Sequence, residues 1–186
     1  MSNTNPHEAF ADAFETDGWR GAFEVVAADT DDQLQYPAAR HAVSLAHLDQ
    51  KARRAEVPLY QSLGGEPVDS IPVNATIGDG SPKETARTAA AARDDGYRAI
   101  KVKVGRGAVE RDLDRLRAVR ERVGAEIELR ADANGAWELP QARTFLEGAE
   151  TLNLSYIEQP LDPERATDHA QLRGTGTPIA LDESLA

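Results

Sequence analysis

Residues 99–104 read Ala99-Ile100-Lys101-Val102-Lys103-Val104. Successive side chains of a β-strand point to opposite faces, so Ile100, Val102 and Val104 would share one face. Lys101 and Lys103 would then share the opposite face, one pleat apart. This stretch predicts a strand with an apolar side and a side that carries two lysines.

Further short apolar segments lie on both sides of this stretch and predict a series of strands. They cover residues 71–77, 126–132, 154–158 and 178–182. Helices are expected between them, because Ser81-Pro82-Lys83-Glu84 is a capping box with proline at the first helical position. Pro140 and Pro163 occupy similar early positions. Strands that alternate with helices of this length predict an α/β fold with βαβ units and a parallel sheet.

The amino-terminal part of the chain has a different pattern. Residues 1–36 are acidic and only weakly periodic, and a helix is expected from Pro37 to about Val57. A short helical turn closed by Gly64-Gly65 would follow. We therefore expect a mainly helical unit over residues 1–66 and a βα unit over residues 67–186.

Four consecutive predicted strands end in a charged residue, namely Lys103, Asp132, Glu158 and Asp182. A single charge at a strand end is usually a solvated loop residue. Four in series are different, because active sites of parallel α/β folds lie at the carboxyl ends of their strands. The sequence therefore places a candidate site at that edge.

The residue types at these strand ends favour a hard divalent cation. Two lysines on an inward face are costly to bury without partners, and three converging carboxylates would repel each other. A metal ion that takes oxygen ligands offsets this repulsion, and Mg²⁺, which binds a few carboxylates plus waters, fits best. No histidine or cysteine stands at these strand ends, which disfavours zinc.

The strand-end motifs resemble those of the muconate-lactonizing branch of the enolase superfamily (the mandelate racemase/muconate lactonizing enzymes). The motifs are Lys101-Val102-Lys103, Asp132-Ala133-Asn134-Gly135, Ile157-Glu158-Gln159-Pro160-Leu161 and Leu181-Asp182-Glu183-Ser184. Tyr36-Pro37-Ala38-Ala39-Arg40 and residues 58–65 resemble the helix that links the family's capping domain to its barrel. The resemblance covers residues 37–186.

The resemblance implies a partial TIM-type (β/α) barrel, with about five of eight strands, preceded by helices of an α+β capping domain. It implies that Asp132, Glu158 and Asp182 bind Mg²⁺, with Mn²⁺ as a possible substitute. The metal would hold a substrate carboxylate and stabilise the enediolate formed when its α-proton leaves.

The same resemblance assigns the other polar residues of the motifs. Lys103 would be the general base, and Lys101 would disfavour a second ammonium beside it. Asn134 and Arg130 would line the site or support its ligands. Glu183 would orient its neighbours, or it is simply an acid at the start of a helix.

The sequence departs from the family's pattern in two places. The family's second catalytic lysine, at the end of a sixth strand, has no counterpart among the 186 residues, and residues 1–36 are too short to form the capping sheet. We therefore expect an incomplete barrel, either an internal fragment or the product of a split or interrupted gene, of low stability by itself. It would be completed by a complementing chain or a homo-oligomer.

Several reactions of this branch fit the motifs. Residues 71–77 and 181–186 resemble o-succinylbenzoate synthases of halophilic archaea, lyases that dehydrate a cyclohexadiene carboxylate in menaquinone biosynthesis. Such a dehydration needs a base on one face only, so we expect this reaction. Dipeptide epimerase, N-acylamino acid racemase and muconate cycloisomerase remain alternatives, as does a non-catalytic fragment.

The composition limits the other classes of function. The chain has 32 acidic and 21 basic residues, only four of the latter being lysines, a balance typical of halophilic proteins. No basic stripe is present to bind nucleic acid. The absence of cysteine, of a long apolar run and of a leader-like amino terminus predicts a cytoplasmic protein that does not span a membrane. The resemblance implies that its partner is a small carboxylate substrate.

Overall fold

The computed structural model describes residues 6–28 and 37–185, and the chain divides into two compact units, Met1–Ile71 and Pro72–Ala186. Tyr36, part of the motif at residues 36–40, lies outside the described residues. No helix in the described part of the chain is long and apolar enough to cross a membrane.

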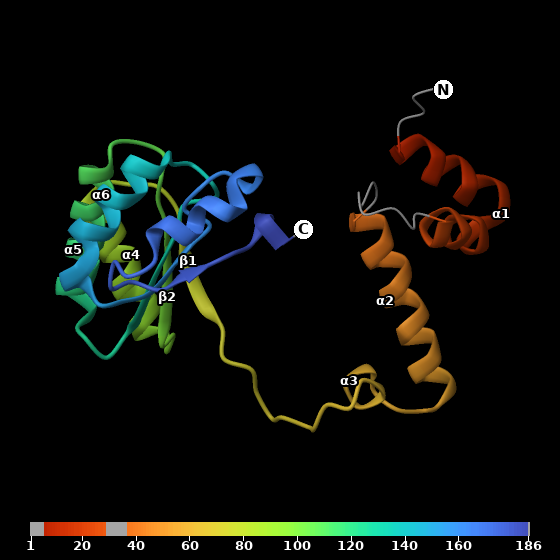
Figure 1. Cartoon of the computed structure of the whole chain (residues 1–186). Coiled ribbons are helices and arrows are strands. Elements are labelled where there is room, and N and C mark those ends of the chain that lie inside the picture. The colour runs from red at the N-terminus through yellow and green to blue at the C-terminus, as the bar shows by residue number, and fades with distance from the viewer. Residues whose placement is uncertain (1–5, 29–36, 186) are drawn as a thin grey trace. The chain divides into compact units, whose positions relative to one another are not determined.

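The first unit is helical. It contains α1 (Pro6–Ala28), which is interrupted at Asp17 and Gly18, then α2 (Pro37–Arg54) and the short α3 (Leu59–Ser62) (Figure 1). The α2 helix ends before Val57, because Glu56 adopts a left-handed conformation with φ of 55°. The amide of Val57 then donates to the carbonyl of Ala52 at 3.1 Å, as in a Schellman motif.

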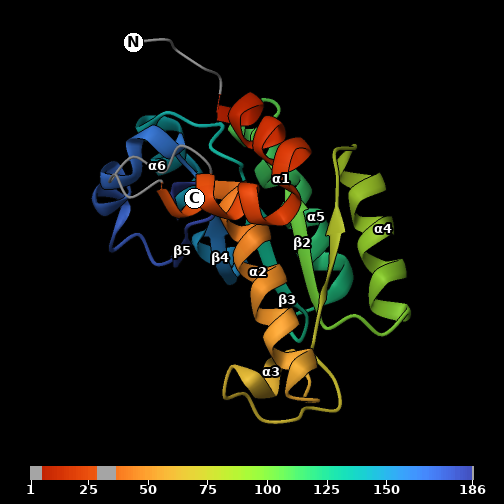
Figure 2. The ribbon, with the colours of Figure 1, turned by 90° about the vertical axis from the view of Figure 1, so that its right-hand side faces the viewer.

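The second unit contains a five-stranded parallel sheet in the order β1-β2-β3-β4-β5, which confirms the predicted α/β fold (Figure 2). The strands are β1 (Asn74–Ile77), β2 (Ala99–Lys103), β3 (Glu128–Asp132), β4 (Leu154–Glu158) and β5 (Ile179–Ala180). Each strand pairs with the next one along the chain. This order is that of a barrel segment, whereas a doubly wound sheet reverses its strand order.

Helices lie between the strands, as the sequence predicts. They are α4 (Pro82–Asp94), α5 (Val109–Val123) and α6 (Leu139–Ala149), with 3₁₀ segments η1 (Glu150–Leu152), η2 (Pro163–Leu172) and η3 (Glu183–Leu185). The Ser81–Glu84 capping box is present, and the side chain of Asp162 caps η2. The segment after β4 is thus a 3₁₀ helix rather than the expected α-helix.

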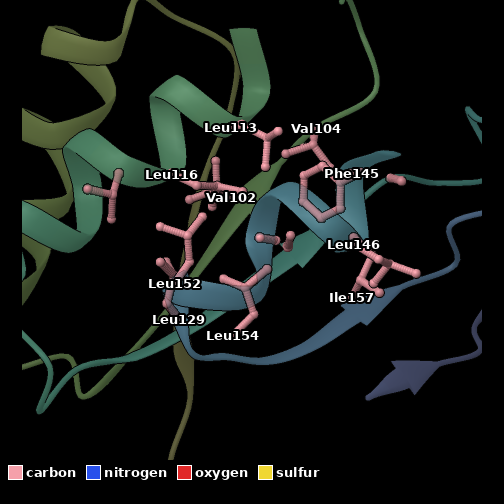
Figure 3. Packing of buried hydrophobic residues seen from close by; sticks show 14 of the residues in the cluster. Val102, Val104, Leu113, Leu116, Leu129, Phe145, Leu146, Leu152, Leu154 and Ile157 are labelled. Carbon is pink, nitrogen blue, oxygen red and sulfur yellow. The ribbon is translucent and has the colours of Figure 1, made fainter. Parts of the chain in front are cut away.

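The core lies between the sheet and the helices that cover one of its faces. Ile100, Val102 and Val104 are buried, as the alternation in β2 predicts. They pack against the apolar stripe of α5, part of which is visible in Figure 3. The stripe consists of Val109, Leu113, Leu116, Val119 and Val123. The opposite face of the sheet is left to the polar side chains.

β3 begins at Glu128, two residues later than predicted, and the outer strands β1 and β5 are also shorter than predicted. β1 begins at Asn74, and Ile71 and Val73 are exposed; β5 ends at Ala180, so Asp182 lies beyond it. Each of these outer strands pairs with one neighbour among the described residues, and that neighbour limits its length. The first residue of β2 faces Asn74, and the last residue of β4 faces Ala180.

Candidate active site

The carboxyl ends of β2, β3 and β4 meet at one edge of the sheet, here called the carboxyl edge. Lys103 pairs in register with Asp132, and Asp132 pairs with Glu158. Lys101 lies two residues before Lys103 on the same face. These four predicted site residues therefore lie side by side, as the strand pattern requires.

A bulge in β4 sets the direction of Glu158. The β3–β4 register shifts between Leu129 and Arg130, so that Leu129 pairs with Leu154 but Arg130 pairs with Tyr156. Ser155 is the extra residue. Because of it, Leu154 can be buried on the helix side while Tyr156 and Glu158 share the face of the lysines.

The four charged side chains form one compact ion-pair network. Lys103 Nζ lies 2.6 Å from Asp132 Oδ2, and Lys101 Nζ lies 3.1 Å from the same oxygen. Lys101 also donates to both carboxylate oxygens of Glu158, at 3.0 and 3.1 Å. Asp132 is only 1% exposed, and the two lysines compensate its burial.

The network shifts the proton affinity of two of its members. Burial by itself would lower the pKa of Lys101, but hydrogen bonds to Glu158 and Asp132 outweigh it and raise that pKa. Burial would raise the pKa of Asp132, but the hydrogen bonds from Lys103 and Lys101 hold it below its ordinary value. Both groups are therefore held in their charged forms.

Asn134 and Glu183 extend this network. Asn134 Oδ1 accepts a hydrogen bond from Lys103 Nζ at 2.7 Å, and the Asn134 amide N–H donates to Asp132 Oδ1 at 3.1 Å. Asn134 Nδ2 donates to Glu183 Oε1 at 3.0 Å. Because a carboxylate only accepts, Glu183 directs the NH₂ group of Asn134 toward itself and the carbonyl oxygen toward Lys103.

Among the described residues, neither Arg130 nor Asp182 forms a side-chain hydrogen bond or an ion pair with the two lysines. Arg130, the middle residue of β3, pairs in register with Lys101, but its side chain forms an ion pair with Glu128 at 2.8 Å and lies over the ring of Tyr156. The side chain of Asp182 is exposed, since β5 ends two residues earlier. Within residues 6–28 and 37–185, no three acidic or histidine side chains converge closely enough to hold a metal ion.

Two of the three predicted metal ligands nevertheless show a fitting arrangement. Asp132 and Glu158 direct their oxygens at the same cation, the ammonium group of Lys101. Nearby, Glu183 Oε2 is buried without a hydrogen-bond partner among the described residues. Oxygen donors around a shared cation suit Mg²⁺ chemically, whereas the position of the third carboxylate remains a prediction.

Gln159 is a site residue that the sequence motifs contain but that we did not assign. It is fully buried, and its Oε1 accepts hydrogen bonds from the amides of Asp182 at 3.0 Å and Ser184 at 3.2 Å. Its Nε2 donates to Ser184 Oγ and to the carbonyl of Leu161. Gln159 thus fixes the backbone that carries Asp182. The sequence feature that could have indicated this role is an uncharged polar residue directly after Glu158.

Comparison with known proteins identifies the family of this chain. Residues 84–186 match the family described as enolase C-terminal domain-like. The chain is 34% identical to N-succinyl-L-Arg/Lys racemase of Bacillus cereus over 151 residues, which are 80% of this chain and 41% of that protein. It is 37% identical to L-talarate/galactarate dehydratase of Salmonella typhimurium over 147 residues, 77% of this chain and 37% of that protein.

A solved structure is also similar to this chain. The dipeptide epimerase from Cytophaga hutchinsonii, complexed with Mg and the dipeptide D-Ala-L-Val, superimposes with a TM-score of 0.75 and 31% identity. The match covers 89% of this chain and 44% of that chain. The chain spans about two fifths of the length of the curated relatives named above. The family match and the parallel sheet with charged strand ends agree. The chain therefore belongs to the enolase superfamily, in the group with mandelate racemase/muconate lactonizing-type C-terminal domains.

Proposed function

We propose that this protein removes the proton α to a carboxylate, assisted by Mg²⁺, and that a second acid on the opposite face of the substrate returns a proton there, so that an amino-acid derivative or a dipeptide is epimerised. The observation that carries this proposal is the network of Lys101, Lys103, Asp132 and Glu158 at the carboxyl edge. A base that removes such a weakly acidic proton needs nearby positive charge to stabilise the product anion.

Asp132, Glu158 and Asp182 would hold the metal. When bound, Mg²⁺ would supply positive charge that stabilises the anion formed from the substrate carboxylate. Gln159 would support this set by fixing the amide of Asp182, so that only the Asp182 side chain has to turn. Glu158 and Asp132 already direct their oxygens at one cation.

Lys103 would be the group that takes the proton. Its side chain is 32% exposed, compared with 18% for Lys101, so Lys103 is the lysine more open to a substrate. Lys101 is held by two carboxylates, whereas Lys103 is held by Asp132 and by the neutral amide of Asn134. Lys101 would then add positive charge and keep the two carboxylates in place.

Epimerisation takes precedence over the expected dehydration because the racemase and the epimerase named above are similar to this chain. Dehydration, as in o-succinylbenzoate synthase, is the second candidate. It is favoured by the similarity to a dehydratase and by the one-sided base that elimination requires. The menaquinone pathway and the halophilic source stay predictions.

The test is exchange of the substrate α-proton with solvent. Purified protein with Mg²⁺ would be incubated in D₂O with N-succinyl amino acids and with dipeptides, and deuterium incorporation would be followed by NMR. Lys103→Ala should abolish exchange without abolishing Mg²⁺ binding, whereas Lys83→Ala, an exposed lysine of α4, should change neither. Exchange that survives Lys103→Ala would identify another base. If these substrates show no exchange, formation of o-succinylbenzoate from its cyclohexadiene carboxylate precursor, tested in a separate incubation, would favour the second candidate.

We further propose that residues 1–66 are a segment of a capping domain and that the sheet is extended at β1 and β5. Among the described residues, each of these strands pairs on one side only. Additional strands, from the same polypeptide, a complementing chain or a second copy, would pair there. Light scattering of the purified protein would distinguish a monomer from an assembly.

A further inference from the structure

Arg115 in α5 is a buried cation outside the ion-pair network described above. Its side chain is 1% exposed, and its guanidinium reaches four acceptors. They are Asp112 Oδ1 at 2.8 Å, the Lys103 carbonyl at 2.8 Å, the Gly78 carbonyl at 2.6 Å and Thr85 Oγ1 at 3.3 Å. A buried guanidinium is tolerated when its donors are bonded in this way.

Two of these acceptors, the carbonyl groups of Gly78 and Lys103, lie at the carboxyl ends of β1 and β2. Gly78 directly follows β1, and Lys103 is the last residue of β2. The second oxygen of Asp112 accepts a hydrogen bond from the amide of Gly105 at 2.7 Å. The Asp112–Arg115 pair therefore holds the backbone on both sides of Val104, and we call this arrangement the α5 clamp.

We propose that Arg115 is a positioning residue for the reaction and that it acts through the backbone of Lys103. The clamp fixes the strand end from which the Lys103 side chain reaches Asp132 and Asn134. It also fixes the turn after β1 at Gly78, on the neighbouring strand. This inference rests on the proposed role of Lys103 as the base.

The clamp acts by geometry rather than by charge. Asp112 and Arg115 are both about 1% exposed and neutralise each other at 2.8 Å. Leu113 and Leu116, between and beside them on α5, are packed against the core and hold the helix on the sheet. A displaced Lys103 is therefore the expected consequence of losing Arg115. A displacement near 1 Å can lower a rate by about a hundredfold.

A second arginine of the same helix provides a matched control. Arg120 also donates to backbone carbonyls, those of Leu152, Asn153, Ile127 and Gly124, at 2.7–3.0 Å. Ile127 and Asn153 directly precede β3 and β4, so Arg120 acts at the opposite edge of the sheet. Both arginines tie α5 to the strands, but only Arg115 does so beside the proposed base.

The experiment compares Arg115→Gln with Arg120→Gln in the purified Mg²⁺-loaded protein. Both variants should lower the melting temperature. Only Arg115→Gln should lower kcat for α-proton exchange, by about tenfold to a hundredfold, with KM changed less than about threefold. The double variant Asp112→Asn/Arg115→Gln avoids an unpaired buried carboxylate and replaces Arg115→Gln if that variant does not fold. Equal kcat losses in the Arg115 and Arg120 variants would overturn the proposal.

A spectroscopic measurement separates this proposal from the proposed activity. The chain has four lysines, Lys51, Lys83, Lys101 and Lys103, so protein labelled with ¹³C at lysine Cε gives few signals. The Lys103 signal should shift in Arg115→Gln, or in the double variant, and stay in place in Arg120→Gln. An unmoved Lys103 signal overturns the positioning role, even where exchange is observed. If the wild-type protein catalyses no exchange but the Lys103 signal shifts in Arg115→Gln or in the double variant, the proposed function is overturned and the positioning role is not.

Discussion

Replacing Asp132 with asparagine removes the carboxylate that both site lysines share. The substitution preserves the shape of the side chain but leaves two ammonium groups with only Glu158 and the Asn134 amide as partners. Removing one member of a fully buried ion pair costs about 3–5 kcal/mol. Because Lys101 and Lys103 are 18% and 32% exposed, solvent screens part of this loss, and we expect about 2 kcal/mol.

Urea denaturation followed by circular dichroism at pH 7 measures this free energy of unfolding. Asp114→Asn is the matched control, since Asp114 pairs with Arg117 at 2.8 Å on the surface and should contribute less than about 0.5 kcal/mol. Asp132→Asn should also lose Mg²⁺ binding in calorimetry. A loss of stability no larger than that of Asp114→Asn would refute the reasoning that the network is energetically coupled.

Three further predictions follow from the charges and the backbone. The stabilising contribution of Asp132, whose folded pKa lies below 3.8, is present above that value and should be lost as pH falls through the folded pKa. The contribution of Lys101, whose folded pKa lies above 10.5, is present below that value and should be lost as pH rises further. A urea midpoint that does not decline at acidic and at strongly basic pH would contradict these two expectations. Gly105→Ala should destabilise the protein by about 1–3 kcal/mol more than Gly96→Ala. Both glycines have positive φ, but only at Gly105 would the added Cβ approach that of Ala136 to 2.6 Å, so equal melting temperatures would argue against this clash. With a net charge of −11, the thermal midpoint should rise between 0.1 and 1 M KCl, because the Debye length falls from about 10 to about 3 Å; a fall would argue against adaptation to salt.

The sequence was sufficient to predict the strands and most of the residues that meet at the carboxyl edge. The alternation at residues 99–104 assigns the apolar and the lysine faces of β2 correctly, because strand geometry forces a period of two. The Ser81–Glu84 capping box locates the start of α4, because capping depends on neighbouring residues alone. The parallel connection of β2, β3 and β4 then brings Lys103, Asp132 and Glu158 together.

Features that depend on contacts between distant segments could not be predicted from the sequence. The bulge at Ser155 is a property of how β3 and β4 pair, and the short β5 leaves Asp182 exposed, contrary to the expected strand end. Arg115 looks like one more charged residue of an amphipathic helix. Its burial is compensated by the carbonyl groups of Gly78, directly after β1, and of Lys103, the last residue of β2.

The sequence by itself therefore determined the order of the elements, the apolar face of the sheet and the residue types at its carboxyl edge. These depend on local periodicity and capping, which neighbouring residues encode. Only the tertiary structure decided that Lys101 bridges Asp132 and Glu158, and that Arg115 fixes the backbone of Lys103. Strand register and the burial of a guanidinium are set by partners from separate segments, and these meet only when the sheet and its helices have packed.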